Sequence, residues 1–307
     1  MSSLGDIIHT FPAVTDMRRA LPDAALDWAV EEAYVPLARM HGGVTRVLPF
    51  ALRRWRRQLA RPSAWREAAA FRRSLREHAY DAILDTQGLL KSAAVARLAR
   101  GPVHGFGPGT AREPLAARFY DFKYEFAPAD HKVERYRTVA ARALGYSPAA
   151  LDYGISAPPQ PNGIPLSPYC VLLHSTARAA KLWREAAWIE VGRHLASRGL
   201  ACVLPSGDEA ERQRAERLAA AIPAATALPR LALGEMCGLI GHAKLAVGVD
   251  TGFMHLAAAL RVPVLGIFCD SEPLDARPLG TGRTAFRGGV GKPPAAQEVI
   301  AALAELA

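Results

Sequence analysis

The sequence predicts an α/β protein with two domains. Short β-rich runs alternate with helical stretches along all 307 residues, which is typical of successive βαβ units on parallel sheets. Prolines and a glycine crowd the segment 158–168 near the midpoint, as in a linker, and the same alternation begins again after it. We therefore expect two Rossmann-like domains, at 1–157 and 158–307, whose parallel sheets face each other across a cleft. Ligands of such folds bind at the carboxyl ends of strands and the amino ends of helices.

In the first domain we expect strands at 26–31, 82–85 and 103–106, and helices at 9–20, 65–78 and 91–99. A parallel sheet normally has a buried strand before its first βα loop. Here a loop-like run, Ser2 to Asp6, directly follows Met1. We therefore expect that about seven residues of a first strand are missing upstream, and that apolar edges of the neighbouring strands are exposed.

In the second domain we expect strands at 169–174, 200–205, 245–249 and 263–268, and helices at 185–197, 209–221, 233–242, 252–260 and 295–306. The last helix is expected to pack back on the first domain. The most apolar run, 245–268, is interrupted by Asp250, His255 and Arg261, so no stretch reaches the ~18 residues of a membrane span. No apolar leader follows Met1, which favours a cytoplasmic protein. We also expect a monomer that binds no nucleic acid.

Positive charge is concentrated in the first half of the chain. The net charge is +9, of which residues 1–157 contribute 23 − 16 = +7 and residues 158–307 contribute 15 − 13 = +2. Nine arginines lie between 53 and 76, where Glu67 is the one acidic residue. This excess indicates a nucleic acid, an anionic membrane surface or a polyanionic substrate as partner. The interleaved Trp55 and Trp65 favour RNA stacking or a membrane surface, and a solvated helical face is the alternative.

Common metal and cofactor motifs are absent from the sequence. The four cysteines are more than thirty residues apart and form no CxxC pair, which favours buried thiols over a zinc ribbon or a disulfide scaffold. No Walker A, GxGxxG, HExxH or DxD motif occurs. We therefore expect no cofactor and no metal, with protein groups alone neutralising the charge of any leaving group.

Asp6 lies just before the helix expected from His9 and is a candidate for two roles. A carboxylate at a helix amino terminus caps it, and Gly5 beside it permits a tight turn. The same carboxylate at the edge of a cleft is able to accept a proton from a hydroxyl group. The residues alone leave both roles open.

Two further strand ends carry polar side chains. The run from Val249 to His255 passes directly from a strand into a helix, and its backbone N–H groups with the Thr251 hydroxyl form a natural phosphate cradle. A simple helix cap is the alternative. Lys181, in the loop after the strand at 169–174, is a suitable point charge for a pyrophosphate, and a solvated surface lysine is the alternative.

Four segments together resemble the bacterial lipopolysaccharide heptosyltransferases, a family of inverting, metal-independent GT-B glycosyltransferases. They are the runs 2–10 (SSLGDIIHT), 85–92 (DTQGLLKS), 110–115 (TAREPL) and 249–252 (VDTG). The resemblance covers nearly the whole chain apart from the expected first strand and the tail after about Asp270. It implies the donor ADP-L-glycero-β-D-manno-heptose, and the inner Kdo of Kdo2-lipid A as acceptor, on the inner face of the inner membrane.

The resemblance also implies roles for individual residues. Asp6 is the expected general base. Donor contacts are expected from Thr176, Lys181, Glu211 (ribose), Leu231 (adenine), Asp250 (heptose hydroxyls), Thr251, Gly252 and His255. Acceptor contacts are expected from Arg53, Arg54, Arg56, Arg57 and Arg112. Two departures from the family pattern are Ala177, in place of a threonine, and Phe253-Met254, in place of a Leu-Ser pair.

Three alternatives remain at this point. A heptosyltransferase acting on a heptose acceptor farther out shares most motifs, although the runs 87–89 and 111–114 favour the enzyme acting on Kdo. A non-catalytic protein that binds RNA or membranes explains the charge but not the strand–Asp-Thr-Gly–helix motif. A nucleotide-sugar epimerase of similar architecture has no need of the arginine cluster.

Overall fold

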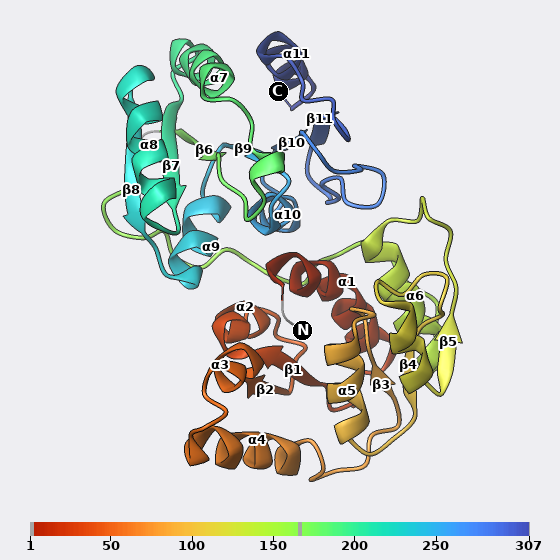
Figure 1. Ribbon diagram of the computed structural model, residues 1–307. Helices are drawn as coiled ribbons and strands as arrows, with labels where there is room; N and C mark the ends of the chain where they lie inside the picture. The colour runs from red at the N-terminus through yellow and green to blue at the C-terminus, as the bar shows by residue number, and fades with distance from the viewer. Residues whose placement is uncertain (1–2, 165–167, 307) are drawn as a thin grey trace. The chain divides into compact units, whose positions relative to one another are not determined.

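The computed structural model describes residues 3–164 and 168–306, and the chain divides into two compact units, Met1–Ala150 and Leu151–Ala307. Each unit has parallel strands alternating with helices, which confirms the predicted α/β class (Figure 1). Ser2 of the first motif and Pro165 of the expected linker lie outside the described residues. Among the described residues, no helix is long and apolar enough to cross a membrane.

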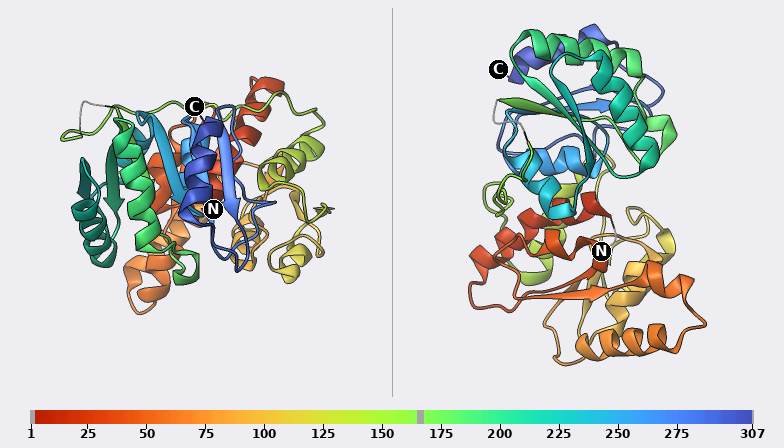
Figure 2. Two further views of the ribbon diagram at one scale, coloured as in Figure 1. Left: turned by 90° about the horizontal axis from the view of Figure 1, so that it is seen from above. Right: turned by 90° about the vertical axis from the view of Figure 1, so that its left-hand side faces the viewer.

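The second unit has one six-stranded parallel sheet of order β11-β10-β9-β6-β7-β8. Its strands are β6 (Tyr169–Leu173), β7 (Ala201–Ser206), β8 (Ala225–Arg230), β9 (Leu245–Val249), β10 (Val264–Phe268) and β11 (Thr284–Gly288). Its helices are α7 (Glu185–Ser197), α8 (Glu209–Ala221), α9 (Leu233–Gly241), α10 (Gly252–Ala259) and α11 (Ala296–Ala302), with 3-10 turns η3 (Ala179–Lys181) and η4 (Leu303–Leu306). Helices cover both faces of the sheet, α7, α8 and α11 on one and α9 and α10 on the other (Figure 2).

Large apolar side chains fix the helices on this sheet. Trp183 and Trp188 are fully buried with their rings 5.3 Å apart, and they pack in one cluster with Leu172 of β6 and Leu204 of β7. Each such side chain contributes about 1.5–3 kcal/mol by leaving water. This packing holds the carboxyl ends of β6, β7 and β9 at one edge of the sheet, where ligands of α/β folds bind.

The first unit has two smaller parallel sheets, of order β1-β2 and β3-β4-β5. Their strands are β1 (Asp27–Glu31), β2 (Arg46–Phe50), β3 (Ile83–Leu84), β4 (Val103–Phe106) and β5 (Phe122–Tyr124). The helices are α1 (Leu4–Ala20), α2 (Val35–Ala38), α3 (Leu52–Arg57), α4 (Pro62–Ser74), α5 (Leu90–Leu98) and α6 (Lys132–Leu144), with 3-10 turns η1 (Glu32–Tyr34) and η2 (Pro114–Phe119). Helix α1 packs against α6.

A cavity of about 790 Å³ lies inside the first unit between the two sheets. Its lining includes Val14 of α1, Trp28 of β1 and Leu84 of β3. Among the described residues, β1 pairs with β2 alone and β3 with β4 alone, so the edges that border the cavity have no ladder partner there. The expected additional first strand stays a prediction.

The N-terminal motif is helical, which corrects the expectation of a loop. Helix α1 begins at Leu4 rather than near His9, with Ser3 as its N-cap. The Ser3 Oγ accepts from the Asp6 N–H at 3.2 Å and donates to Asp6 Oδ2 at 2.6 Å. Capping by Asp6 itself is therefore wrong. Ser3 satisfies the free N–H of Asp6 in the first turn, which allows the helix to begin at Leu4.

The proline-rich segment packs on the second unit. The Pro158 carbonyl lies 2.9 Å from Nε2 of His242, and any side chain at Gly238 would collide with the Pro159 carbonyl. The division between the units accordingly falls at Ala150, ahead of the boundary expected at 157. Helix α11 packs against α7 and β11 of its own unit.

Candidate active site

Asp85, directly after β3, fixes the loop that follows. Its carboxylate accepts from the Gln87 N–H at 2.8 Å and from the hydroxyls of Ser92 and Tyr120 at 2.8 and 2.7 Å. Asp85 is buried. Because a buried carboxylate is stable only when donors surround it, these bonds hold the loop 85–92 in one conformation.

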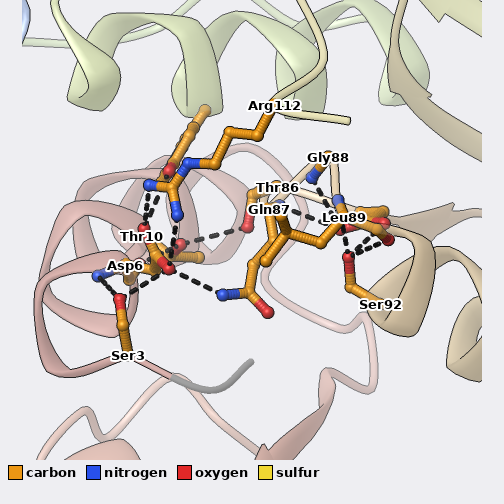
Figure 3. Close-up of polar contacts among 11 residues, drawn as sticks. Ser3, Asp6, Thr10, Thr86, Gln87, Gly88, Leu89, Ser92 and Arg112 are labelled. Carbon is orange, nitrogen blue, oxygen red and sulfur yellow. Dashed lines mark hydrogen bonds and ion pairs between the residues drawn. The ribbon is translucent and has the colours of Figure 1, made fainter. Parts of the chain in front are cut away.

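The same loop fixes the segment that carries Arg112. Gly88 has a φ of +66°, a conformation that favours glycine. Its carbonyl accepts from the Glu113 N–H at 3.0 Å, and Glu113 Oε2 accepts from the Leu90 N–H at 2.6 Å. The backbone next to Arg112 is therefore held by hydrogen bonds, and its side chain points at Asp6 (Figure 3).

Five hydrogen bonds converge on the carboxylate of Asp6, which is 2% exposed. Arg112 donates two, from Nη2 to Oδ1 at 2.5 Å and from Nη1 to Oδ2 at 3.2 Å. Gln87 Nε2 and Ser3 Oγ each donate to Oδ2 at 2.6 Å. Tyr136 Oη, from helix α6, donates to Oδ1 at 3.3 Å.

These contacts keep Asp6 ionised. Burial raises the pKa of the carboxyl, but the Arg112 charge and the hydrogen bonds from Ser3, Arg112 and Gln87 outweigh burial, and the pKa lies below its usual range. Burial together with the Asp6 charge holds the pKa of Tyr136 well above its usual value, so its hydroxyl stays a donor. An ionised carboxylate in this setting is able to serve as a base toward a hydroxyl.

Four of the predicted acceptor arginines stand on α3, at the carboxyl end of β2. Arg53, Arg56 and Arg57 are exposed, and the Arg53 guanidinium lies 5.9 Å from the Tyr34 ring centre. Arg54 is engaged differently, because Glu32 and Glu67 both pair with its guanidinium, at 2.9 and 2.8 Å. The structure therefore brings Arg112 to Asp6, while the α3 arginines form a separate basic surface in the same unit.

Trp55 is half-buried, with its indole held by two neighbours. Its indole N–H donates to Glu67 at 3.0 Å, and its ring packs 6.1 Å from that of Phe71. Trp65, in contrast, is 62% exposed beside the arginines of α4, and Leu59 is 60% exposed. This surface combines cations with apolar side chains, as in proteins that contact anionic membranes.

In the second unit, neighbouring strands β6 and β9 bring Lys181 and Asp250 together. The Lys181 Nζ donates to Asp250 Oδ2, and the Thr176 hydroxyl donates to the Asp250 carbonyl at 3.2 Å. The two charged side chains are 17% and 13% exposed, so a freely solvated Lys181 is wrong. Burial raises the pKa of Asp250, but the hydrogen bonds from Lys181 and Ser271 and the charges of Lys181 and His255 together outweigh burial, and the pKa is lowered.

The other predicted donor residues stand at the same edge of this sheet. Thr251 is the N-cap position of α10, without a side-chain capping bond, and Gly252 begins the helix. His255 is buried one turn later, and its charge contributes to the lowered pKa of Asp250. Glu211, in the first turn of α8 after β7, accepts from the Gly207 N–H at 2.7 Å, and Leu231 follows β8. No described contact joins Glu211 or Leu231 to Asp250.

Sequence reasoning gave no role to three groups that organise these sites. Gln87 lies in the recognised run 85–92. A polar side chain just after a predicted strand is a signal that could have identified it. Tyr136 is 130 residues from Asp6 in the chain and has no local signal. Glu113 acts through its backbone and carboxylate on the loop after β3. In the described part of the chain, no cluster of three or more His, Cys, Asp or Glu side chains is placed to hold a metal ion.

Comparison with known proteins agrees with the motifs. The sequence pattern of glycosyltransferase family 9 (heptosyltransferase) matches residues 68–301. Lipopolysaccharide heptosyltransferase 1 of Pseudomonas aeruginosa is 45% identical over 278 residues, which cover 89% of this chain and 78% of that protein.

Solved structures are similar over the full length. E. coli heptosyltransferase WaaC with ADP has a TM-score of 0.89 at 38% identity, covering 100% of this chain and 98% of that one. The same enzyme with ADP-2-deoxy-2-fluoro heptose has a TM-score of 0.85, with the same coverage. On these matches, and with the recognised motifs placed at the strand ends, the chain belongs to glycosyltransferase family 9, the heptosyltransferases.

Proposed function

We propose that this heptosyltransferase moves L-glycero-D-manno-heptose from ADP-heptose to the inner Kdo of Kdo2-lipid A, with inversion at the anomeric carbon. Heptose transfer from ADP-heptose in lipopolysaccharide core synthesis is the activity of its relatives. The observation that carries the proposed chemistry is the Asp6 carboxylate, buried, ionised and surrounded by five hydrogen bonds.

In this proposal Asp6 is the general base. The acceptor hydroxyl loses its proton to the Asp6 carboxylate while its oxygen attacks the anomeric carbon of heptose. The bond from that carbon to the diphosphate breaks, and ADP leaves with the bonding electron pair. Proton removal by a well-placed base contributes about 10²–10⁴-fold to such a rate, which makes Asp6 the residue with the largest expected effect on turnover.

The donor site is proposed at the carboxyl edge of the second unit's sheet. Lys181 and the amino end of α10, with Thr251 and Gly252, would neutralise the diphosphate, because a cation and free N–H groups there favour anions. Asp250 would accept from heptose hydroxyls. The remaining proposed donor contacts are Thr176, Glu211 at the ribose, Leu231 at the adenine and His255.

The acceptor site is proposed at Arg112 and the arginines of α3, which match the phosphates and carboxylates of Kdo2-lipid A in charge. Because that acceptor is a membrane lipid, we also propose peripheral binding at the inner face of the inner membrane. Exposed Trp65 and Leu59 beside the arginines of α4 support this placement.

The test is heptose transfer from ADP-heptose, followed by mass spectrometry of two acceptors, Kdo2-lipid A and the same lipid already carrying one heptose. We expect transfer to the first acceptor. Asp6→Asn should lower kcat by about 10²–10⁴-fold and leave intact the rise in melting temperature caused by ADP.

Asp81→Asn is the matched control, because Asp81 is an exposed aspartate of the same unit. Near-normal turnover of the Asp6 variant would refute the general base. Transfer to the heptosylated acceptor alone would replace the proposed acceptor by the one farther out in the core.

A further inference from the structure

We propose that Arg112 is a latch on Asp6 that an anionic group of the acceptor opens. In this structure the Arg112 guanidinium donates two hydrogen bonds to the Asp6 carboxylate. An acidic group of the incoming acceptor draws the guanidinium away, and Asp6 then has a free lone pair for the proton of the acceptor hydroxyl. The proposal rests on the function proposed above and adds a condition to it, namely that Asp6 becomes an effective base when an anionic acceptor is bound.

The first observation is the number of donors around Asp6. A carboxylate offers about four lone-pair positions, and Asp6 already accepts from Ser3, Gln87, Tyr136 and twice from Arg112. An acceptor hydroxyl must donate to one of these oxygens before it can transfer its proton. One of the present donors therefore has to leave.

The second observation is that Arg112 is the most exposed of these donors. Its side chain is 40% exposed, whereas that of Asp6 is 3% exposed. Tyr136 and Gln87 are buried, and Ser3 is the N-cap that starts α1. The backbone beside Arg112 is held through Glu113, so the guanidinium is able to swing outward while the loop stays in place.

The third observation is the chemistry of the guanidinium. Its fork of donors binds carboxylates and phosphates through two parallel hydrogen bonds, so an anionic acceptor group offers it an equivalent partner. A neutral sugar offers no such exchange. The latch therefore makes the reaction selective for acidic acceptors at the step of proton transfer, in addition to their binding.

Opening the latch also strengthens the base. Burial raises the pKa of Asp6, and the charge and hydrogen bonds of Arg112 are among the causes that lower it, so removal of the guanidinium raises this pKa. The other ionisable groups nearby are Tyr136, which stays protonated, and Asp85 beyond it, which acts on Tyr136. The His9 ring lies 6.3 Å from the Tyr136 ring. The His131 ring lies farther along, 5.8 Å from the His9 ring.

The experiment compares the pH profiles of kcat/KM for Kdo2-lipid A and of kcat, at saturating ADP-heptose. The first reports the free enzyme's base and the second reports the base in the complex. We expect the acid limb of kcat to lie about 1–3 pH units above that of kcat/KM in the unsubstituted enzyme. Arg112→Gln should raise the limb of kcat/KM toward that of kcat. Arg118→Gln, an exposed arginine on η2, should leave both limbs in place.

A second measurement does not need turnover. The ¹³C signal of the Asp6 carboxyl, assigned by difference against Asp6→Asn, should titrate below about pH 4 in the unsubstituted protein. Its midpoint should rise on addition of Kdo2-lipid A in micelles, and in Arg112→Gln without any acceptor.

Coincident acid limbs, or a carboxyl midpoint that neither Arg112→Gln nor Kdo2-lipid A moves, would overturn the latch. These results are separate from failure of the proposed function. That failure would appear as an active Asp6→Asn variant, whereas failure of the latch alone would appear as an inactive Asp6→Asn variant with unmoved limbs.

Discussion

Lys181 and Asp250 form an ion pair that joins the loop after β6 to the carboxyl end of β9, although 69 residues separate them in the chain. Both side chains are largely buried, at 17% and 13% exposure. The diphosphate of the proposed donor would bind a lysine that is already paired with a carboxylate. Asp250 therefore holds the Lys181 side chain in position and also sets how strongly it attracts an anion.

Replacing Lys181 with alanine should weaken donor binding. The loss of a charge-assisted hydrogen bond to phosphate costs about 1.5–3 kcal/mol, which corresponds to about a 10–100-fold rise in the Kd of ADP. Isothermal titration calorimetry measures this Kd directly. Lys244→Ala is the control, because Lys244 is exposed at the amino end of β9, the opposite edge of the sheet. Equal Kd values for ADP in both variants would remove Lys181 from the donor site.

The α3 arginines should differ from one another in acceptor binding. Arg56 is exposed and has no ion-pair partner among the described residues, whereas Arg54 is paired with Glu32 and Glu67. Arg56→Gln should therefore raise the KM for Kdo2-lipid A several-fold with kcat nearly unchanged, and Arg54→Gln should raise it less. Steady-state kinetics at two salt concentrations measures this, since screening should reduce the effect of Arg56. A larger effect of Arg54 would contradict the assignment.

The sequence predicted every central strand, whereas the strands that it missed, β2, β5, β8 and β11, all lie at sheet edges. β4 and β9 are fully buried, and both were predicted at the observed bounds. β8 contains Pro229 and is mostly exposed, so it carries no apolar run. An edge strand tolerates proline and polar residues because one side of its backbone needs no partner, and the usual pattern is then lost.

The site residues that lie in sequence motifs were predicted, and those that reach the site only through helix packing were missed. Asp6, Arg112 and Asp250 stand in motifs with a recognisable order. Tyr136 reaches Asp6 because α6 packs on α1, and no local pattern announces such a contact. The contacts of Trp55 with Glu67 and Phe71 likewise depend on the packing of α3 against α4. Family membership excludes a non-catalytic protein and an epimerase.

A buried ion pair should stabilise the packing of α1 on α6, the helices that carry Asp6 and Tyr136. Arg137 Nε donates to Asp16 Oδ2 at 2.7 Å, and the two side chains are 5% and 2% exposed. Arg137→Met leaves the Asp16 carboxylate buried without its charge partner, which costs about 3–5 kcal/mol. Urea unfolding measures the loss in the free energy of unfolding. The double variant Arg137→Met/Asp16→Leu should recover most of it, and no recovery would show that packing of Arg137 dominates.

His174 should make the second unit less stable in mild acid. It is fully buried at the carboxyl end of β6, where its Nε2–H donates to the Pro205 carbonyl at 3.1 Å. The Ser175 hydroxyl then donates to Nδ1 at 2.9 Å, so the ring is neutral. Burial and the nearby Arg214 charge lower the pKa of His174 from 6.5 to about 4.

The sign of the effect follows from proton binding. Between pH 6.5 and about 4 the unfolded chain binds a proton at His174 that the folded chain does not, so stability falls as the pH falls through this window. The full difference is about 3 kcal/mol, at ~1.4 kcal/mol per pH unit. Asp6 and Asp250, whose pKa values are lowered, stay ionised in this window and lose their contribution at lower pH.

Urea unfolding of the unsubstituted protein and of His174→Gln at pH 7, 6, 5 and 4 measures this effect. The variant should be less stable at pH 7, because the hydrogen bonds of the ring are altered, and its stability should change less between pH 6.5 and 4. His242→Gln, an exposed histidine of the same unit, should keep the full pH dependence. Because Ser175 and Thr176 follow His174 directly, protonation of the ring should also disturb the loop that carries Lys181. If instead His174→Gln retained the acid-induced loss of stability, the dependence would arise from another group.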